Sequence, residues 1–267
     1  MNWKQLISAK RFGMEEFHEE RQENRSEFQR DYDRLIFSAP FRRLQNKTQV
    51  FPLPGSVFVH NRLTHSLEVA SVGRSLGDDV AKALLERHPE LQDSFLPEIG
   101  SIVSAACLAH DLGNPPFGHS GEKAISTFFS EGKGVRLKEK QPNGEQLSPM
   151  EWEDLTHFEG NANAFRILTH QFEGRRKGGF VLTYTTLASI VKYPFSSSLA
   201  GTKSKFGFFV SEEESFKKIA TELGLTLLNE HPLKYARHPL VYLVEAADDI
   251  CYQMMDIEDA YKLKILT

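Results

Sequence analysis

Cysteine is scarce in this sequence: its 267 residues include only two, Cys107 and Cys251, both in apolar stretches typical of helices. Such a pair does not form the disulfide framework of a small secreted domain, so we expect a reducing compartment. The sequence also lacks any apolar run near the ~20 residues that a membrane span needs. Its first 17 residues, MNWKQLISAKRFGMEEF, show no apolar core before a small-residue cleavage site. We therefore expect a cytoplasmic protein without membrane contact.

An excess of one charge is missing as well. The formal net charge is −4, with 25% charged and 40% hydrophobic residues, which is close to the average for soluble globular proteins. A dedicated nucleic-acid-binding protein usually has a strongly basic balance, so that class is disfavoured, although a local basic groove remains compatible. P-loop, Gly-x-Ser-x-Gly and dinucleotide-binding glycine patterns are absent from the sequence.

Helical periodicity, by contrast, is abundant. Residues 64–88 repeat apolar side chains on one broad helical face, and Pro89 ends the segment. A second apolar helix is predicted over about residues 99–110, stopped by a glycine–proline break. Residues 239–263 form a last long helical segment. Without internal repeats, the sequence predicts one mostly α domain with minor β structure.

Turn and capping residues predict several finer features. Residues from about 131 to 150 are polar and are predicted to form a long surface insertion. The other predicted features are an N-cap at Ser120, a cap at Thr185 or Thr186 for a helix that ends before Pro194, a short hairpin over residues 203–210, and a capping box between Ser211 and Glu214.

Titratable residues gather at the ends of the apolar helices. Adjacent His110 and Asp111 can reach one ion only where their helix ends, because helix neighbours point about 100° apart. His65 has apolar neighbours on both sides, so we expect it to face inward. Asp248 and Asp249 are carboxylates in an apolar helix, where burial requires a partner or a metal. Spacing alone leaves the choice between these two open.

The ordered set of histidines and aspartates predicts a metal site. Each residue alone is also compatible with an ordinary core or surface role, so the set is informative only together. Imidazole and carboxylate ligands suit Mn²⁺, Mg²⁺ or Fe²⁺ better than a structural zinc, which favours cysteine. We expect Mn²⁺ or Mg²⁺, with Fe²⁺ or Zn²⁺ as alternatives.

Five stretches of the sequence carry a family resemblance. In order they resemble the deoxyguanosine triphosphate triphosphohydrolase (dGTPase)-like branch of the HD-domain phosphohydrolases, and they cover most of residues 41–260. The resemblance implies a mostly helical HD-domain fold. The stretches are FRRLQNKTQVFPL (41–53), NRLTHSLEVA (61–70), AHDLGNPPFGHSGEKA (109–124), HFEGNANAFRIL (157–168) and YLVEAADDICYQMMDIEDA (242–260).

The resemblance implies a reaction and its metal ligands. In that reaction, water attacks the α-phosphorus of a deoxynucleoside triphosphate (dNTP), with dGTP the favoured substrate, and releases the deoxynucleoside and intact triphosphate. Such an enzyme would help to control dNTP pools. The implied ligands are His65, His110, Asp111 and Asp248. For the last of these, the i, i+4, i+8 series that begins at Asp248 agrees with the resemblance.

The resemblance also assigns a catalytic pair and a set of substrate contacts. His119 could protonate the departing 5′-oxygen or relay a proton, and Glu122, one turn further on, could orient that imidazole. Tyr252 would stack on the deoxyribose where a 2′-OH would clash, and Asp256 and Gln49 would bind the 3′-OH. The expected phosphate contacts are Arg62, placed one turn before His65, and His157, Lys192 and Tyr193.

Domain organisation and partners follow from the same resemblance. Residues 1–40 are expected to be an N-terminal helical arm and residues 41–267 the HD-domain core, with the family's C-terminal region absent. Asn114 stands where animal relatives have another histidine, which fits the bacterial branch. We expect a homo-oligomer, hexameric by resemblance, and a nucleotide or single-stranded DNA effector. The alternatives are another HD phosphohydrolase, acting on a nucleoside monophosphate, cyclic nucleotide or alarmone, and a nucleotide-sensing or nucleic-acid-binding protein.

Overall fold

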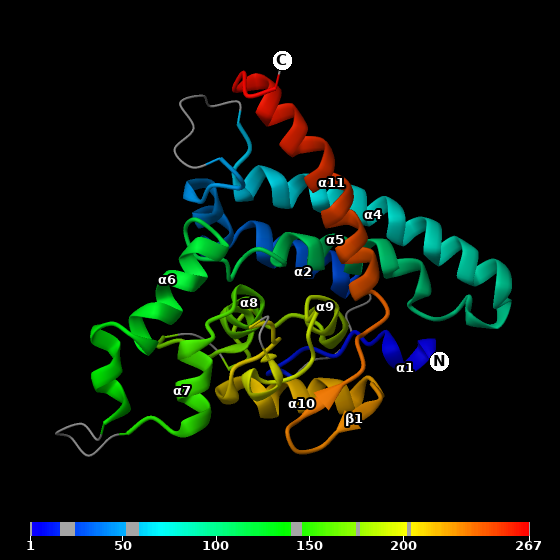
Figure 1. The fold of residues 1–267 in the computed structure, drawn as a ribbon. Coiled ribbons are helices and arrows are strands. Elements are labelled where there is room, and N and C mark those ends of the chain that lie inside the picture. Colours follow the sequence, from blue (N-terminus) through cyan, green and yellow to red (C-terminus); the bar gives the residue numbers. More distant parts are fainter. Residues whose placement is uncertain are drawn as a thin grey trace.

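The computed structural model describes residues 2–16, 25–51, 59–139, 146–174, 177–201 and 204–266. These residues are mostly helical with one small antiparallel hairpin, so the predicted mostly-α fold with minor β structure is confirmed (Figure 1). No helix in this part of the chain is long and apolar enough to cross a membrane.

The elements follow one another along the chain in this order. The helices and strands are α1 (Trp3–Leu6), α2 (Glu27–Ile36), α3 (Ala39–Arg43), α4 (Arg62–Arg87), α5 (Ile99–Ala109), α6 (His119–Ser130), α7 (Pro149–Thr156), α8 (Gly160–Thr169), α9 (Tyr184–Ser189), α10 (Glu213–Glu222), β1 (Leu227–Asn229), β2 (Lys234–Tyr235) and α11 (Val241–Lys262). Short 3₁₀ helices lie at Leu44–Asn46 (η1), Pro89–Leu91 (η2), Leu96–Glu98 (η3), Lys133–Lys138 (η4), Ser197–Leu199 (η5) and Val210–Glu212 (η7).

Helices α4 and α5 form the centre of the fold. The side chain of Asn61 accepts hydrogen bonds from the N–H groups of Leu63 and Thr64 and caps the start of α4. Every residue of helix α5 except Ser101 is buried. The two helices pack closely because Gly77 faces Gly100, and a Cβ on Gly77 would lie 2.7 Å from the Gly100 Cα. Both helices therefore form much as the sequence predicts, and α4 begins two residues before the predicted start.

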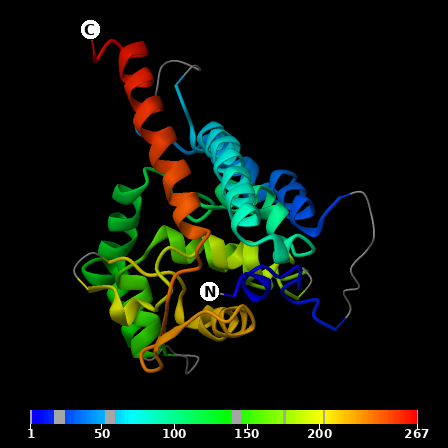
Figure 2. The same ribbon diagram turned by 90° about the vertical axis from the view of Figure 1, so that its right-hand side faces the viewer.

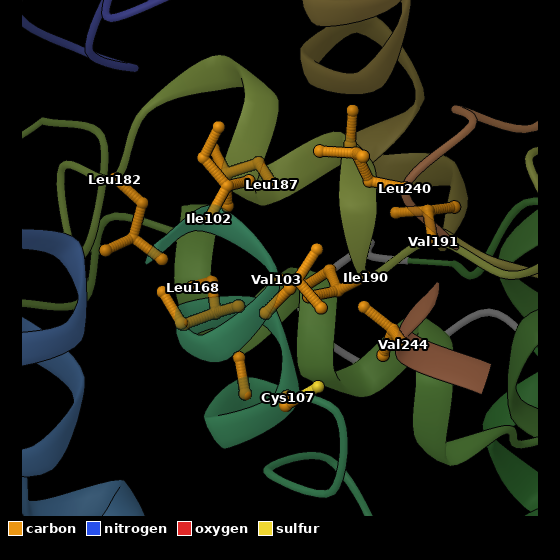
Figure 3. Close-up of a cluster of buried hydrophobic side chains, with 14 of the residues drawn as sticks. Ile102, Val103, Cys107, Leu168, Leu182, Leu187, Ile190, Val191, Leu240 and Val244 are labelled. Carbon is orange, nitrogen blue, oxygen red and sulfur yellow. The ribbon is translucent and has the colours of Figure 1, made fainter. Parts of the chain in front are cut away.

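Other helices surround this pair. Figures 1 and 2 show α11 crossing α4 and α5 on one side, while α2 lies against α5 on the other. The core is continuous from α5 into the segments around α8, α9 and α11. Side chains that meet there include Ile102, Val103, Cys107, Leu168, Leu187 and Val244 (Figure 3).

A buried ion network fixes the N-terminal segment. The Arg11 guanidinium is 1% exposed and pairs with Glu27 and Asp31 of α2. Asp31 lies 2.7 Å from an Arg11 nitrogen. Removing the cation would take a directly bonded positive charge from two buried carboxylates, while Asp31 would keep its hydrogen bonds from Thr183. The division into an arm of residues 1–40 and a core of residues 41–267 stays a prediction.

A second polar contact ties α11 to the start of α4. Asp259 accepts hydrogen bonds from the His60 backbone N–H at 2.9 Å and from the His60 Nδ1 at 2.8 Å. The His60 Nε2 faces Glu68 Oε1 of α4 at 3.2 Å. Burial lowers the pKa of His60, but the hydrogen bond to Asp259 and the charge of Glu68 outweigh it and raise that pKa. The contact thus joins two helices that carry site residues.

The predicted N-cap at Ser120 is wrong. Helix α6 begins at His119, and its N-cap is Gly118, two residues before the predicted cap, with φ +53°. Phe117 also has a positive φ, of 66°. These two left-handed residues turn the chain before Ser120, which therefore lies inside the first helical turn.

The other predicted caps are also wrong. Thr183, not Thr185 or Thr186, caps α9, because its hydroxyl accepts the Thr186 N–H at 3.3 Å. The Thr185 hydroxyl instead bonds the N-terminal segment. Ser211 forms no capping box with Glu214, since a 3₁₀ turn precedes α10 and no side chain caps that helix.

The predicted hairpin over residues 203–210 is wrong as well. Residues 204–210 contain no strand, and Phe206 and Phe208 are fully buried there. The hairpin of the described chain instead pairs β1 with β2 further on. Of the predicted polar insertion, residues 140–145 lie outside the described residues.

Candidate active site

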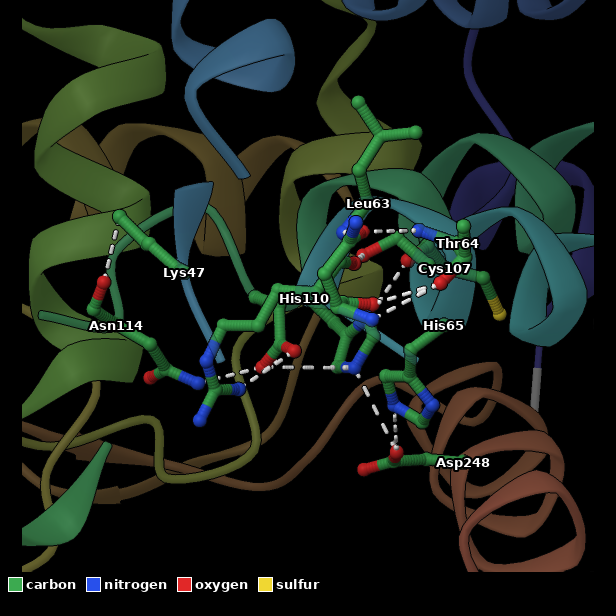
Figure 4. Close-up of polar contacts among 12 residues, drawn as sticks. Lys47, Leu63, Thr64, His65, Cys107, His110, Asn114 and Asp248 are labelled. Atoms are coloured by element: carbon green, nitrogen blue, oxygen red, sulfur yellow. Dashed lines mark hydrogen bonds and ion pairs between the residues drawn. The ribbon is translucent and has the colours of Figure 1, made fainter. Parts of the chain in front are cut away.

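The start of α4, the end of α5 and the first half of α11 bring the four predicted metal ligands together (Figure 4). His65 Nε2 lies 3.1 Å from Asp248 Oδ1, and His110 Nε2 lies 3.5 Å from the same oxygen. His110 Nε2 is also 3.6 Å from Asp111 Oδ1. Ligand atoms of His65, His110 and Asp111 all lie within 4.8 Å of one another. The four side chains thus converge on one point.

A hydrogen bond fixes the ring of His110. Its Nδ1 lies 2.6 Å from the Cys107 carbonyl oxygen, which can only accept, so Nδ1 carries the proton. His110 Nε2 therefore faces Asp111 and Asp248, and it is the ring nitrogen that would bind a metal in place of a proton. With two imidazole nitrogens and two carboxylates, the donor set fits a divalent metal.

The same contacts shift the ionisation of these groups. Burial raises the pKa of Asp248, but His110, His65 and Lys192 outweigh it and hold that pKa far below its usual range. Burial lowers the pKa of His110, but Asp111 and Asp248 outweigh it and raise the pKa to about 8. Both shifts have the sign expected of a site whose carboxylates stabilise a cation.

Asp111 is held from its other side by two donors. Arg62 Nη1 donates to Asp111 Oδ2 at 2.7 Å, and the Asn114 side-chain amide donates to Oδ1. The Lys47 ammonium donates to the backbone carbonyl oxygen of Asn114 at 2.6 Å. Burial raises the pKa of Asp111, but His110 and Arg62 lower it below the usual value. Arg62 thus orients a ligand here, and its phosphate contact stays a prediction.

The predicted catalytic pair lies at the start of α6. His119 Nδ1 is 2.7 Å from Glu122 Oε2, and the His119 side chain is 84% exposed. The other oxygen of Glu122 accepts the backbone N–H of Gly160 at 2.8 Å. One carboxylate therefore fixes the imidazole while the first residue of α8 fixes the carboxylate. Among the described residues His119 is engaged only through Nδ1, so its Nε2 is available for proton transfer.

Metal ligands and catalytic pair line one cavity of about 420 Å³. The cavity includes every predicted site residue except His157 and Asp256. His157 turns instead toward Glu153, whose Oε2 lies 3.1 Å from the His157 Nδ1. Asp256 accepts a hydrogen bond from the Tyr252 side chain, one turn earlier on α11. The predicted residues that line the cavity are Gln49, Arg62, His65, His110, Asp111, His119, Glu122, Lys192, Tyr193, Asp248 and Tyr252.

Two charged residues of this cavity were not predicted from the sequence. Glu159 is 1% exposed and forms an ion pair with Lys205 at 2.8 Å. Burial lowers the pKa of Lys205, but Glu159 and Glu122 outweigh it and raise that pKa. In the sequence, Glu159 stands within the family-like stretch of residues 157–168 and before the small residues of α8, where it acts as the N-cap. Lys205 had no signal.

Comparison with known proteins agrees with this geometry. The model of the HD domain family matches residues 62–178, a range that includes His65, His110 and Asp111. Asp248 lies beyond that match, on α11.

Relatives align with the whole chain. A deoxyguanosinetriphosphate triphosphohydrolase-like protein of Synechocystis sp. is 45% identical, over 100% of this chain and 61% of its own length. A protein of the same name from Pseudomonas aeruginosa is 46% identical, over 100% of this chain and 58% of its own length.

A third relative carries the name without the suffix. The deoxyguanosinetriphosphate triphosphohydrolase of Yersinia enterocolitica is 37% identical, over 100% of this chain and 56% of its own length. The chain thus spans between 56% and 61% of the length of these relatives. The chain is therefore similar along its whole length to deoxyguanosinetriphosphate triphosphohydrolase-like proteins, and its residues 62–178 match the HD domain.

Proposed function

We propose that this protein hydrolyses dNTPs, with dGTP as the first substrate to test, to the deoxynucleoside and inorganic triphosphate. The observation that carries the proposal is the shared cavity, where the four-residue cluster at His110 and the His119–Glu122 pair face one space. Lys192 and Lys205 line the same space and supply positive charge for a polyphosphate. The names of the relatives support the same substrate class. The proposed role is control of dNTP pools in the cytoplasm.

The proposed metal is Mn²⁺ or Mg²⁺, with Fe²⁺ or Zn²⁺ as alternatives, held by His65, His110, Asp111 and Asp248. When bound, it would polarise the α-phosphoryl oxygen and acidify the attacking water. Nδ1 of His119 is engaged by a carboxylate, so its Nε2 would hand a proton to the departing 5′-oxygen.

Recognition of the sugar would come from Gln49 and from the turns of α11 that follow Asp248. We propose that Tyr252 stacks on the deoxyribose, while Asp256 and Gln49 bind the 3′-OH. The Gln49 Oε1 is buried and has no hydrogen-bond partner among the described residues, which supports a ligand contact. Lys192, Tyr193 and Arg62 are the proposed phosphate contacts. His157 is kept as a further candidate, although its side chain lies outside the cavity.

The test incubates each of the four dNTPs with Mn²⁺ or Mg²⁺, with and without nucleotide or single-stranded DNA, and separates the products by chromatography. We expect deoxynucleoside and triphosphate. Phosphate, pyrophosphate or a linearised product would indicate another HD phosphohydrolase, and binding without turnover would indicate a sensor.

His119→Ala is expected to lose about 10²- to 10⁴-fold in kcat. His170→Ala, which alters a histidine outside the cavity, is the matched control. Sedimentation of the same sample tests the proposed hexamer.

A further inference from the structure

Glu159 is a buried carboxylate in the wall of the cavity, directly before α8. Its Oε2 accepts the backbone N–H groups of Asn161 at 2.6 Å and Ala162 at 3.3 Å. Its Oε1 accepts the Asn161 side-chain amide at 2.7 Å and the Lys205 ammonium at 2.8 Å. Each oxygen is thus engaged by two donors of the protein itself, which is the environment of a residue that positions others rather than one that binds substrate.

Lys205 lies between the carboxylates of Glu159 and Glu122, at unequal distances from the two. Its Nζ is 2.8 Å from Glu159 but 3.8 Å from Glu122 Oε2. That same Glu122 oxygen holds His119 Nδ1 at 2.7 Å. An ammonium released from Glu159 would be drawn to the next carboxylate, where it would compete with the imidazole for one oxygen.

We propose that Glu159 is a positioning residue, which anchors Lys205 away from Glu122 and so keeps Glu122 free to orient His119. The expected loss of kcat rests on the proposed function, whereas the effect of Glu159 on the positions of Lys205 and His119 does not. Glu159 acts here through Lys205 and Glu122 and touches no reacting atom.

Glu159→Gln separates this role from the capping of α8. The glutamine oxygen can still accept both backbone N–H groups, since only an acceptor fits there. The amide nitrogen then replaces Oε1 and meets two donors, the Lys205 ammonium and the Asn161 amide. The anchor of Lys205 is lost while the helix cap is kept.

Steady-state kinetics supply the first measurement. We expect Glu159→Gln to lower kcat by about 10- to 100-fold, as a small misplacement of a reacting group does, with a smaller change in KM. Added to His119→Ala, the same change should lower kcat by less than about twofold, because its route through His119 is already gone. Glu212→Gln is the matched control, since Glu212 is also buried and pairs with Arg166 of α8 but does not line the cavity. An equal loss in both backgrounds overturns the proposal.

Histidine-selective ¹⁵N NMR supplies a measurement that needs no turnover. We expect the His119 ring signals to change in Glu159→Gln, to return to those of the wild type when Lys205→Met is added, and to stay unchanged in Glu212→Gln. Unchanged His119 signals in Glu159→Gln, or no return in the double variant, overturn the proposal. If the NMR result is as expected but no dNTP yields triphosphate, the proposed function fails and the positioning role stands.

Discussion

Gly113 offers the sharpest test of how the site is assembled. It lies in the turn after Asp111 and packs directly on the start of α8. A Cβ at this position would lie 2.0 Å from the Gly160 carbonyl oxygen and 2.1 Å from the Ala164 nitrogen. Both are backbone atoms, so no rotamer change relieves the clash. Because ordinary contacts of a Cβ begin at 3.4 Å, Gly113→Ala must displace α8 or the turn by more than 1 Å.

The displacement acts on the catalytic pair through one hydrogen bond. The Gly160 N–H holds Glu122 at 2.8 Å, and Glu122 holds His119. A misplacement of about 1 Å can cost about 10²-fold in rate, so we expect kcat of Gly113→Ala to fall by about that factor. Forcing a methyl group into a packed contact also costs roughly 1 to 3 kcal/mol of the free energy of unfolding. For a chain of this size, this lowers Tm by about 2 to 4 °C per kcal/mol.

The matched control is Gly77→Ala in the contact between α4 and α5. Its Cβ would meet the backbone of Gly100 at 2.7 Å, so it too overpacks a helix contact, but outside the cavity. Triphosphate release and calorimetric Tm are measured for both variants. We expect both to lose stability and only Gly113→Ala to lose most of its kcat. A Gly113→Ala protein with the kcat of the wild type would refute the coupling between the turn and the catalytic pair.

Three further predictions concern metal binding, stability and pH. Asp248→Asn should weaken Mn²⁺ binding by more than about 100-fold in calorimetric titration, whereas Asp249→Asn should change it by less than about threefold; the reverse order would reassign the ligand. Arg11→Met should cost about 3 to 5 kcal/mol in urea unfolding, against less than about 1 kcal/mol for the exposed Arg25→Met, and equal losses would contradict the burial argument. The raised pKa of His60 stabilises the fold fully below about pH 6.5, so the Tm advantage of wild type over His60→Gln should shrink as pH rises; a growing advantage would reverse the sign.

The helices that carry the proposed metal ligands could be predicted from the sequence because their apolar periodicity is clear. The apolar periodicity around His65 and before His110 sets the two central helices, and the glycine–proline break sets where the second one ends. A carboxylate in the apolar face around Asp248 needs a partner, and it finds His65 at 3.1 Å and Lys192 at 3.3 Å. Periodicity and buried charge are both readable without coordinates.

Features that depend on tertiary contacts could not be predicted from periodicity or from buried charge. Ser120 is a good capping residue, yet two left-handed residues before it set the start of α6. Phe206 lies in a segment that resembles a strand but serves as core without pairing. Glu159 and Lys205 are 46 positions apart, and neither belongs to a pattern that predicts their contact. Local propensity cannot report partners that only the folded chain brings together.

The turn between α5 and α6 explains why the proposed metal ligands and the His119–Glu122 pair line the same cavity. Ligands on α4, α5 and α11 form the metal half, and the pair on α6, supported by α8, forms the proton-transfer half. Asn163 of α8 donates to the Gly113 carbonyl at 2.8 Å, so the turn is fastened to α8 as well as to α5. Since Asn114 reaches back to Asp111, a shift of this turn moves a metal ligand and the catalytic histidine together. The helix-breaking turn, with titratable residues at both of its ends, therefore fixes the metal half and the proton-transfer half relative to each other.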